Sequence, residues 1–539
     1  MNPTLQIHTP AQHDYDNPAV ETNPKRLAKW LKQLPLLDLT ASVTELRDAI
    51  GLANEQSMPA KTRLRLLELY YEPVLSVFGA GEDEHLRSLP MSSAERTRTK
   101  EEIGQLCGAL ANGYKILVKE EHVAGQSPAR SQAALLALYR AMEMTALGLL
   151  HSFRTYQVVP AFAYLDAHQL YAFARHQEVL DAPVVFEKKT VSETGPGDLY
   201  LRVMLLAVTD PFHLGVGAAS KLFGLFRQYA GLCRTLAVDG DITAQGCFVV
   251  DLARDRPPVP CARAQSEQSL PQHGYILDVR PAMKDARQRL EQLCQTSAAA
   301  KVENEELHLL KLLVPGLEKN RLRGGARRTV RRETRIAVGI DTIHYFLATG
   351  RTALDMAFVD SDRAIQTRDP DSEEEGQFNL EPWTMVNESA NGCLLASRDR
   401  RQPGVRIGDA VGIVSLGSDD RPRVTLAVAR WMRKATKGGM EMGVEVIPGR
   451  MLPVRCVPAG ESRPMVDDRP RGLFVPRAAA EKVPATLMLP KQVYSPDRLI
   501  EVHTRERVTR VRAGNLVMDT EHFDRFDFAV VESEQLAGT

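Results

Sequence analysis

The chain lacks the features that mark several common classes of protein. Its seven cysteines are scattered, and none forms a Cys-x-x-Cys pair, which argues against a disulfide framework and against a zinc site. No apolar run reaches the roughly 18 residues of a membrane-spanning helix, and the first twenty residues lack a signal-peptide pattern. Lys and Arg number 68, as do Asp and Glu, so the net charge provides no general attraction to nucleic acid. Together these features predict a cytoplasmic protein with reduced thiols.

The short motifs of the common enzyme classes are also missing. The sequence contains no His-Glu-x-x-His, no Gly-x-Ser-x-Gly, no phosphate-loop lysine and no protein-kinase set. Its 13 histidines are dispersed, without carboxylates at metal-ligand spacing. Residues 215–220 loosely resemble a dinucleotide-binding loop, but the third glycine and a surrounding βαβ pattern are lacking. We therefore predict a protein that is not an enzyme and holds no metal and no cofactor.

The first 318 residues divide into a helical and a mixed segment. After a predicted disordered tail over residues 1–22, apolar residues recur at helical spacing through residues 23–237. Asn23-Pro24 is typical of a helix start, with a capping residue followed by a first-turn proline. No strict repeat is present, so we expect an irregular all-α array. Residues 238–318 combine short strand-like and helical pieces and are predicted to be a mixed α/β connecting segment.

A strongly basic segment follows. Residues 327–335 read Arg-Arg-Thr-Val-Arg-Arg-Glu-Thr-Arg and lead into the apolar stretch 336–347. The planar guanidinium group of arginine makes paired hydrogen bonds to phosphate oxygens and to guanine O6 and N7. Three arginine pairs are spaced by four residues, namely Arg327 and Arg331, Arg328 and Arg332, and Arg331 and Arg335. By itself the segment is also typical of a solvated linker or of nonspecific contact with nucleic acid.

A polar motif interrupts the apolar sequence about fifty residues later. Residues 387–392 read Asn-Glu-Ser-Ala-Asn-Gly, an N-x-S-x-x-G pattern. Asn387 can accept from the guanine N1–H and N2–H₂ edge, and Ser389 adds a hydroxyl. Gly392 permits positive φ and a close approach of the backbone to a ligand. By itself the motif is typical of an ordinary turn between strands, but with the basic segment it predicts a clamp for an anionic nucleotide.

A β-barrel pattern surrounds the two motifs. Strand-like segments rich in β-branched and aromatic residues recur, separated by turn residues. They cover residues 336–347, 383–386, 392–396, 407–414, 424–432 and 442–447. We therefore predict an antiparallel barrel over residues 319–457, which makes the chain a multidomain α+β protein.

Residues 325–455 resemble the PilZ domain family, whose members are receptors for the bacterial second messenger cyclic di-GMP. The resemblance is carried by the R-x-x-x-R segment, the N-x-S-x-x-G turn, Gly408-Asp409, Arg430-Trp431 and Gly443-Val444-Glu445. It implies that cyclic di-GMP is the ligand and that the binding residues are Arg331, Arg335, Asn387, Ser389 and Gly392, with weaker support for Arg327, Arg328 and Arg332. Arg331 and Arg335 are favoured because the second arginine of the family motif leads directly into the first strand.

Two segments depart from the family pattern or lie beyond it. Residues 350–379 are an insertion with an acidic stretch, either a solvated loop or a lid whose carboxylates occupy the arginines. Residues 458–539 comprise a linker and a β-rich segment, either a second small barrel or strands that extend the first.

The favoured function is a cytosolic cyclic di-GMP receptor. Ligand would order the basic arm, and the helical region would pass the signal to an unknown protein partner. The alternative is a PilZ-like interaction scaffold that binds no ligand. Nonspecific binding of nucleic acid is disfavoured by the balanced charge.

Overall fold

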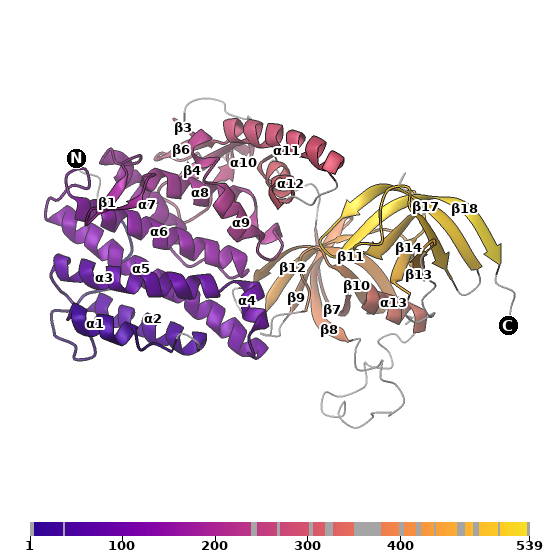
Figure 1. The fold of residues 1–539 in the computed structure, drawn as a ribbon, viewed down its shortest axis with the longest axis horizontal. Coiled ribbons are helices and arrows are strands. Elements are labelled where there is room, and N and C mark those ends of the chain that lie inside the picture. Colours follow the sequence, from indigo (N-terminus) through magenta and orange to yellow (C-terminus); the bar gives the residue numbers. More distant parts are fainter. Residues whose placement is uncertain are drawn as a thin grey trace, which may run out of the picture. The chain divides into compact units, whose positions relative to one another are not determined.

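A computed structural model of the chain describes residues 5–35, 38–238, 245–266, 270–300, 305–318, 327–349, 379–397, 404–416, 422–435, 438–460, 469–477, 484–504 and 507–535. The chain divides into two compact units, Met1–Gly324 and Gly325–Thr539. The first is mainly helical and the second mainly β-strand (Figure 1). The predicted multidomain α+β class is therefore confirmed. The predicted insertion at residues 350–379 lies almost entirely outside the described residues.

The first unit is an irregular helical array, as predicted. Its helices are α1 (Pro24–Leu31), α2 (Leu39–Glu55), α3 (Ala60–Ala80), α4 (Asp83–Ser88), α5 (Ser93–Val123), α6 (Gln132–Arg154), α7 (Ala163–His176), α8 (Pro196–Val208), α9 (Ala218–Leu225), α10 (Cys261–Ser266), α11 (Arg280–Ala300) and α12 (Glu305–Glu318), with short 3₁₀ turns η1 (Pro211–His213) and η2 (Ala230–Leu232). Asn23 caps α1 as predicted, since its side chain accepts from the backbone N–H groups of Lys25 and Arg26. A capping box formed by Ser92 and Glu95 starts α5.

Helix α6 lies at the centre of this array. It packs against α5, α7, α8 and α9, and Leu136, Met144 and Leu149 are fully buried. Among the described residues, α6 is also the helix that is long and apolar enough to cross a membrane, but 78% of its most apolar stretch is buried inside the unit. Its composition is therefore explained by its position in the core.

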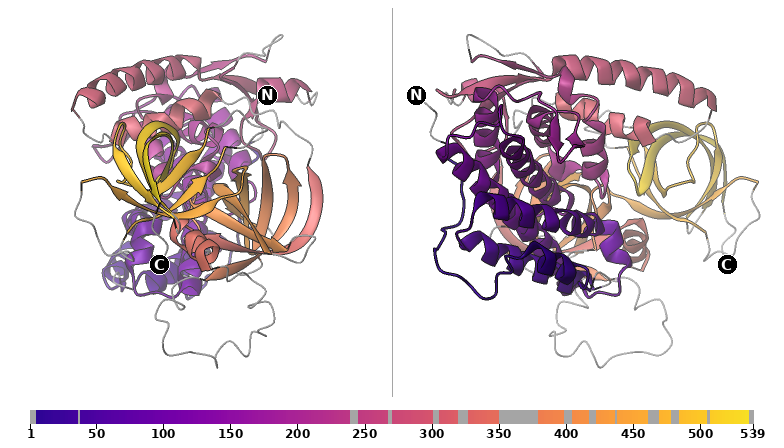
Figure 2. Two further views of the ribbon diagram at one scale, coloured as in Figure 1. Left: turned by 90° about the vertical axis from the view of Figure 1, so that its right-hand side faces the viewer. Right: turned by 60° about the vertical axis from the view of Figure 1, so that its left-hand side comes forward.

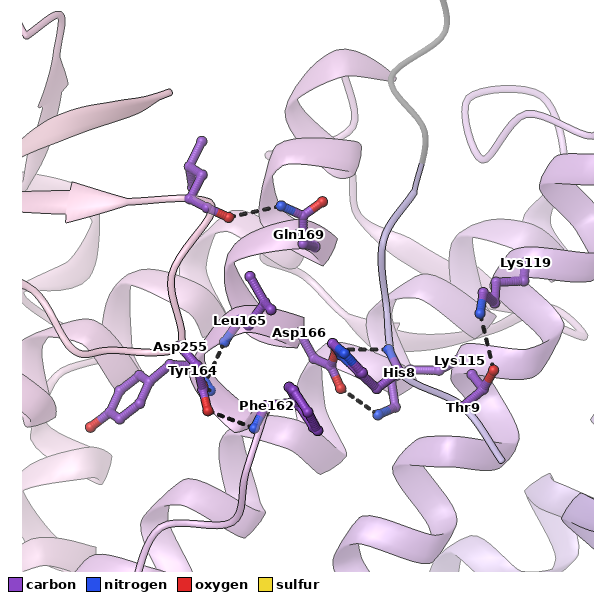
Figure 3. A network of polar contacts seen from close by, with 11 residues as sticks. His8, Thr9, Lys115, Lys119, Phe162, Tyr164, Leu165, Asp166, Gln169 and Asp255 are labelled. Carbon is purple, nitrogen blue, oxygen red and sulfur yellow. Dashed lines mark hydrogen bonds and ion pairs between the residues drawn. The ribbon is translucent and has the colours of Figure 1, made fainter. Parts of the chain in front are cut away.

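The beginning of the chain packs against this array. The His8 backbone N–H donates to Asp166 Oδ1 at 2.9 Å, and the His8 ring stacks on Phe162 at 3.6 Å between centroids. Asp166 is buried and also accepts from Lys115 Nζ at 2.6 Å (Figure 3). The prediction of a disordered tail over residues 1–22 is therefore wrong around His8, because its backbone N–H and ring join the buried ionic network of Asp166 and Lys115.

A four-stranded antiparallel sheet joins the same core. Its order is β3-β6-β4-β5, from β3 (Arg234–Leu236), β4 (Cys247–Asp251), β5 (Val259–Pro260) and β6 (Gly274–Asp278). Phe248 and Tyr275 pack into the helical core. A separate hairpin is formed by β1 (Val184–Phe186) and β2 (Lys189–Ser192). The segment predicted as a connector, residues 238–318, therefore belongs to the first unit in its described part.

The second unit contains two closed antiparallel barrels. The first has the order β7-β8-β9-β12-β11-β10, and pairing of β10 with β7 closes it. Its strands are β7 (Arg328–Val338), β8 (Leu380–Ser389), β9 (Gly392–Ser397), β10 (Ala410–Leu416), β11 (Pro422–Lys434) and β12 (Met440–Val446). This is the barrel predicted from the sequence.

The C-terminal strands form a barrel of their own, which settles the alternative left open above. The closed barrel is visible in the last part of the chain, coloured yellow, in Figure 2. Its strand order is β13-β14-β15-β18-β17-β16. The strands are β13 (Leu452–Pro458), β14 (Arg471–Val475), β15 (Thr486–Pro490), β16 (Leu499–His503), β17 (Arg507–Asp519) and β18 (Phe523–Gln535). Because β13 pairs with β14 and β16, the second barrel begins at Leu452 and not after residue 457 as predicted.

The stretch 336–347 was predicted to be one continuous strand, and this prediction is wrong. Strand β7 ends at Val338, Gly339 adopts φ +84°, and helix α13 (Ile340–Thr349) follows. The buried apolar side chains of α13 recur every three residues, at Ile340, Ile343 and Phe346. They join an apolar cluster with residues of both barrels, and α13 packs against β13 and β14. An apolar β-branched stretch suits a strand or a buried helix, and here the positive-φ glycine separates the two.

Candidate functional site

The pairing of β7 with β8 places the basic segment beside the polar turn. In the antiparallel register Arg328 lies opposite Glu388, and Thr329 lies opposite Asn387. The strand β8 ends at Ser389, and β9 begins at Gly392 after a tight turn. The start of β7 and the β8–β9 turn therefore meet at the same end of the barrel.

A β-bulge changes the spacing of the arginines. The register shifts between Thr329 and Arg332, so Val330 and Arg331 together face the single residue Val386. Bulges of this kind reorient side chains and recur beside binding sites. Arg331 is consequently placed in the bulge, between the turn and the regular part of β7.

Two arginines contact the same carboxylate. Arg328 donates to Glu388 Oε1 at 2.5 Å, and Arg332 lies 3.9 Å from Glu388 Oε2. Arg332 also donates to the Met385 sulfur at 3.5 Å. The Arg328 side chain is 76% exposed and that of Glu388 is 30% exposed, so the pair is open to solvent.

A concave surface lies at this end of the barrel. It is lined by Arg327, Arg328, Glu388 and Ser389 and has a volume of about 490 Å³. Three of these four residues were predicted to bind ligand from the sequence, two of them with weaker support. A volume of this size is in the range of small-molecule sites.

The turn itself is held internally. Ser389 Oγ donates to the Gly392 carbonyl at 3.0 Å, so this hydroxyl braces the turn. Gly392 does not have the positive φ that the sequence suggested. A Cβ at this position would lie 2.3 Å from the Val444 carbonyl oxygen on β12, so the close approach of the two strands requires glycine here.

Arg335 lies apart from this group. It is seven residues beyond Arg328 on β7, about 23 Å at about 3.3 Å per residue, and its register partners are Pro382 and Val414. The structure thus gathers the arginines at the start of β7 with the turn, and the favoured pair of Arg331 and Arg335 is spread along the strand.

The carboxylate of Glu388 also affects Cys393, which lies opposite it on β9 and is buried. Burial and, to a smaller extent, the charge of Glu388 raise the pKa of the Cys393 thiol to about 11, and Arg332 opposes this shift. Glu388 was not predicted as a site residue, because it occupies a variable position of N-x-S-x-x-G. An acid inside a motif expected to bind an anion is the signal that could have identified it.

The other family features have local structural roles. Gly408 has φ +89°, and Asp409 Oδ2 accepts from the Arg406 backbone N–H at 2.6 Å. A Cβ at Gly443 would lie 1.9 Å from Trp431 Nε1, so the indole lies directly against β12. No group of three or more metal-ligating side chains occurs among the described residues.

The first barrel of the second unit and its turn match a PilZ domain. A family model described as "Cyclic-di-GMP receptor FimW, middle PilZ domain" matches residues 357–453. This match begins after β7, so it does not include the arginines. Models described as "Cyclic-di-GMP receptor FimW, N-terminal domain" and "FimW C-terminal beta-barrel domain" match residues 25–238 and 465–531.

The particular relative is similar over nearly its whole length. The chain is 23% identical over 587 aligned positions to the cyclic-di-GMP receptor FimW of Pseudomonas aeruginosa. The alignment covers 98% of this chain and 94% of the relative. The order of helical, PilZ and C-terminal barrel regions is therefore shared by both proteins.

Proposed function

We propose that the chain is a bacterial cytoplasmic receptor for cyclic di-GMP that has no enzymatic activity and needs no cofactor. The proposal is supported by the family and by the similarity to a protein named as a receptor for this nucleotide. Seven free thiols suit a reducing compartment. The observation that carries the proposal is the register of β7 and β8, which sets Arg328 beside the N-x-S-x-x-G turn in one concave surface.

In the proposed site the arginines bind the phosphates and guanine faces of the ligand. The cationic forks, which match phosphate oxygens in pairs, come from Arg327 just before β7 and from Arg328, Arg331 and Arg332 in its first part. Asn387 and Ser389 lie on the adjacent strand end, where a short amide side chain can accept from guanine. Gly392 keeps the β8–β9 turn close to β12, so its role is to shape the site.

The test is calorimetric titration of the full chain with cyclic di-GMP, with GTP as the control ligand. Arg328→Ala is expected to weaken binding about tenfold or more, since a charge-assisted hydrogen bond contributes about 1.5–3 kcal/mol. Arg335→Ala is the matched control from the same strand and is expected to leave the affinity nearly unchanged. A large loss with Arg335→Ala and none with Arg328→Ala would place the site further along β7.

We propose that the signal passes through the connection between the units. The second unit begins at Gly325, two residues before Arg327, so ligand held by the arginines is suited to act on the connection between the units. This coupling does not require ligand to order the whole basic arm, because β7 is already a paired strand from Arg328. A spin-label distance between the units that is identical with and without cyclic di-GMP would contradict this coupling.

A second candidate is the interaction scaffold without ligand. The observation that favours it is the ion pair between Arg328 and Glu388, which already gives this arginine an anionic partner. The same titration separates the two, because a scaffold would show no heat of binding with either nucleotide.

A further inference from the structure

We propose that Glu388 is a built-in anion that holds the arginine site until a phosphate of the nucleotide displaces it, so that this carboxylate sets the affinity of the site. The inference rests on the proposed function and deepens it. It assigns a role to a residue that lies between Asn387 and Ser389 and belongs to neither the arginine segment nor the fixed positions of the turn motif.

The contacts of Glu388 are those expected of a bound anion. One carboxylate oxygen accepts from Arg328 at 2.5 Å, and the other lies 3.9 Å from Arg332. Arginine recognises carboxylate and phosphate through the same planar fork of N–H donors. A phosphate that engages the same N–H group of Arg328 therefore takes the position that the Glu388 carboxylate holds.

The location of the pair also fits displacement. Glu388 and Arg328 line the concave surface together with Arg327 and Ser389. Because the Arg328 side chain is 76% exposed, the ion pair is screened by water and contributes little to stability. A weak, exposed pair can be broken by ligand, so Glu388 lowers the affinity without closing the site.

A carboxylate that remains nearby also repels the ligand. Its field is felt by Cys393, whose pKa Glu388 raises in addition to the larger effect of burial. Competition for the arginines and repulsion of phosphate both lower the affinity for the nucleotide. Removing the charge is therefore expected to tighten binding.

The barrel offers a matched control pair. Arg433 and Glu441 form an ion pair between β11 and β12 at 2.7 Å, with side chains 55% and 25% exposed. Glu441 lies opposite Ala396 on β9, at the far end of that strand from Gly392. The two glutamates thus share ion-pair chemistry and exposure but differ in their distance from the turn.

The experiment compares the full chain with Glu388→Gln and Glu441→Gln by calorimetric titration with cyclic di-GMP at low and at high salt. Glu388→Gln is expected to tighten binding about two- to fivefold, the range that corresponds to an exposed ion pair. Its affinity is also expected to fall more steeply with salt, because Arg328 no longer has a protein anion to exchange. Glu441→Gln is expected to match the unsubstituted chain in both respects.

The outcomes distinguish the two levels of the proposal. Equal affinities of Glu388→Gln and the unsubstituted chain would overturn the role of Glu388 and leave the receptor function standing. Weaker binding by Glu388→Gln would also overturn it and would make Glu388 a direct ligand contact. Absence of binding in all three proteins would overturn the receptor function and the inference together. Equal melting temperatures of the proteins ensure that affinities of folded chains are compared, and Glu388→Ala repeats the test without an amide.

Discussion

Arg328 on β7 lies directly opposite Glu388 on β8, and their side chains meet at 2.5 Å. This one cross-strand pair fixes which end of the basic segment reaches the polar turn. It also places a carboxylate among the arginines expected to bind an anionic nucleotide. The proposed competition between Glu388 and the ligand for Arg328 follows from that relationship.

The Arg328–Glu388 pair is expected to contribute little to folding. A double-mutant cycle with Arg328→Ala and Glu388→Ala should give a coupling energy of about 0.2–1 kcal/mol, as for other exposed ion pairs. The measurement is urea unfolding followed by tryptophan fluorescence in a Trp30→Phe background, which leaves Trp383 and Trp431 of the second unit as reporters. A coupling of several kcal/mol would mean that the pair is structural and resists displacement.

Gly392→Ala is expected to destabilise the first barrel. The added Cβ would lie 2.3 Å from the Val444 carbonyl oxygen, and backbone atoms of a paired strand cannot move aside easily. We expect a loss of about 1–3 kcal/mol in the free energy of unfolding, the range typical of overpacking. Asn391→Ala is the control, since Asn391 is exposed in the same turn and should change stability by less than about 0.5 kcal/mol.

Asp166→Asn is expected to destabilise the helical unit. Asp166 is the partner of buried Lys115, and burial already lowers the pKa of this ammonium group while Asp166 opposes that shift. Removing the carboxylate leaves an uncompensated buried charge, which costs about 3–5 kcal/mol. Urea unfolding followed by circular dichroism at the helical band measures the loss.

The same substitution should also release the start of the chain. His8 bonds to Asp166 through its backbone N–H and its ring, so hydrogen exchange at His8 should accelerate in Asp166→Asn. The double substitution Lys115→Met and Asp166→Leu should recover part of the stability. If Asp166→Asn leaves hydrogen exchange at His8 unchanged, the stacking of the His8 ring on Phe162 holds the start of the chain by itself.

The second unit is expected to lose stability on mild acidification through His344. This residue of α13 is 6% exposed, and burial, together with Arg455 and Arg471, lowers its pKa to about 4. Because the pKa in the unfolded chain is higher, about 6.5, unfolding takes up a proton below that pH. The stabilising contribution is complete above pH 6.5 and is lost as the pH falls toward 4.

The contribution of His344 to the free energy of unfolding is expected to fall by about 2 kcal/mol between pH 7 and pH 5. It is measured as the difference in pH dependence between the unsubstituted chain and His344→Gln in the Trp30→Phe background. Exposed His273 in the first unit provides the control substitution, His273→Gln. A pH dependence that His344→Gln leaves unchanged would mean that other groups cause the loss.

Several parts of the fold were predictable because they depend on neighbours in sequence. The cap at Asn23 and Pro24, the helical spacing of the first unit and the N-x-S-x-x-G turn of the barrel are local patterns. The misassigned stretch 336–347 shows the limit of this approach. Its apolar residues suit a strand and a helix equally, and only the packing of Ile343 and Phe346 against residues of both barrels decides for a helix.

By itself, the sequence determined the class of the protein: a helical region, a PilZ barrel and a second β-rich segment. It also pointed to arginines and a polar turn as the proposed site. It also determined that three arginine pairs had the required spacing. Which arginines meet the turn was decided only by the tertiary structure, because cross-strand register and the bulge at Val330 and Arg331 depend on two strands at once. For the same reason Glu388 became visible as part of the site only when β7 and β8 were paired.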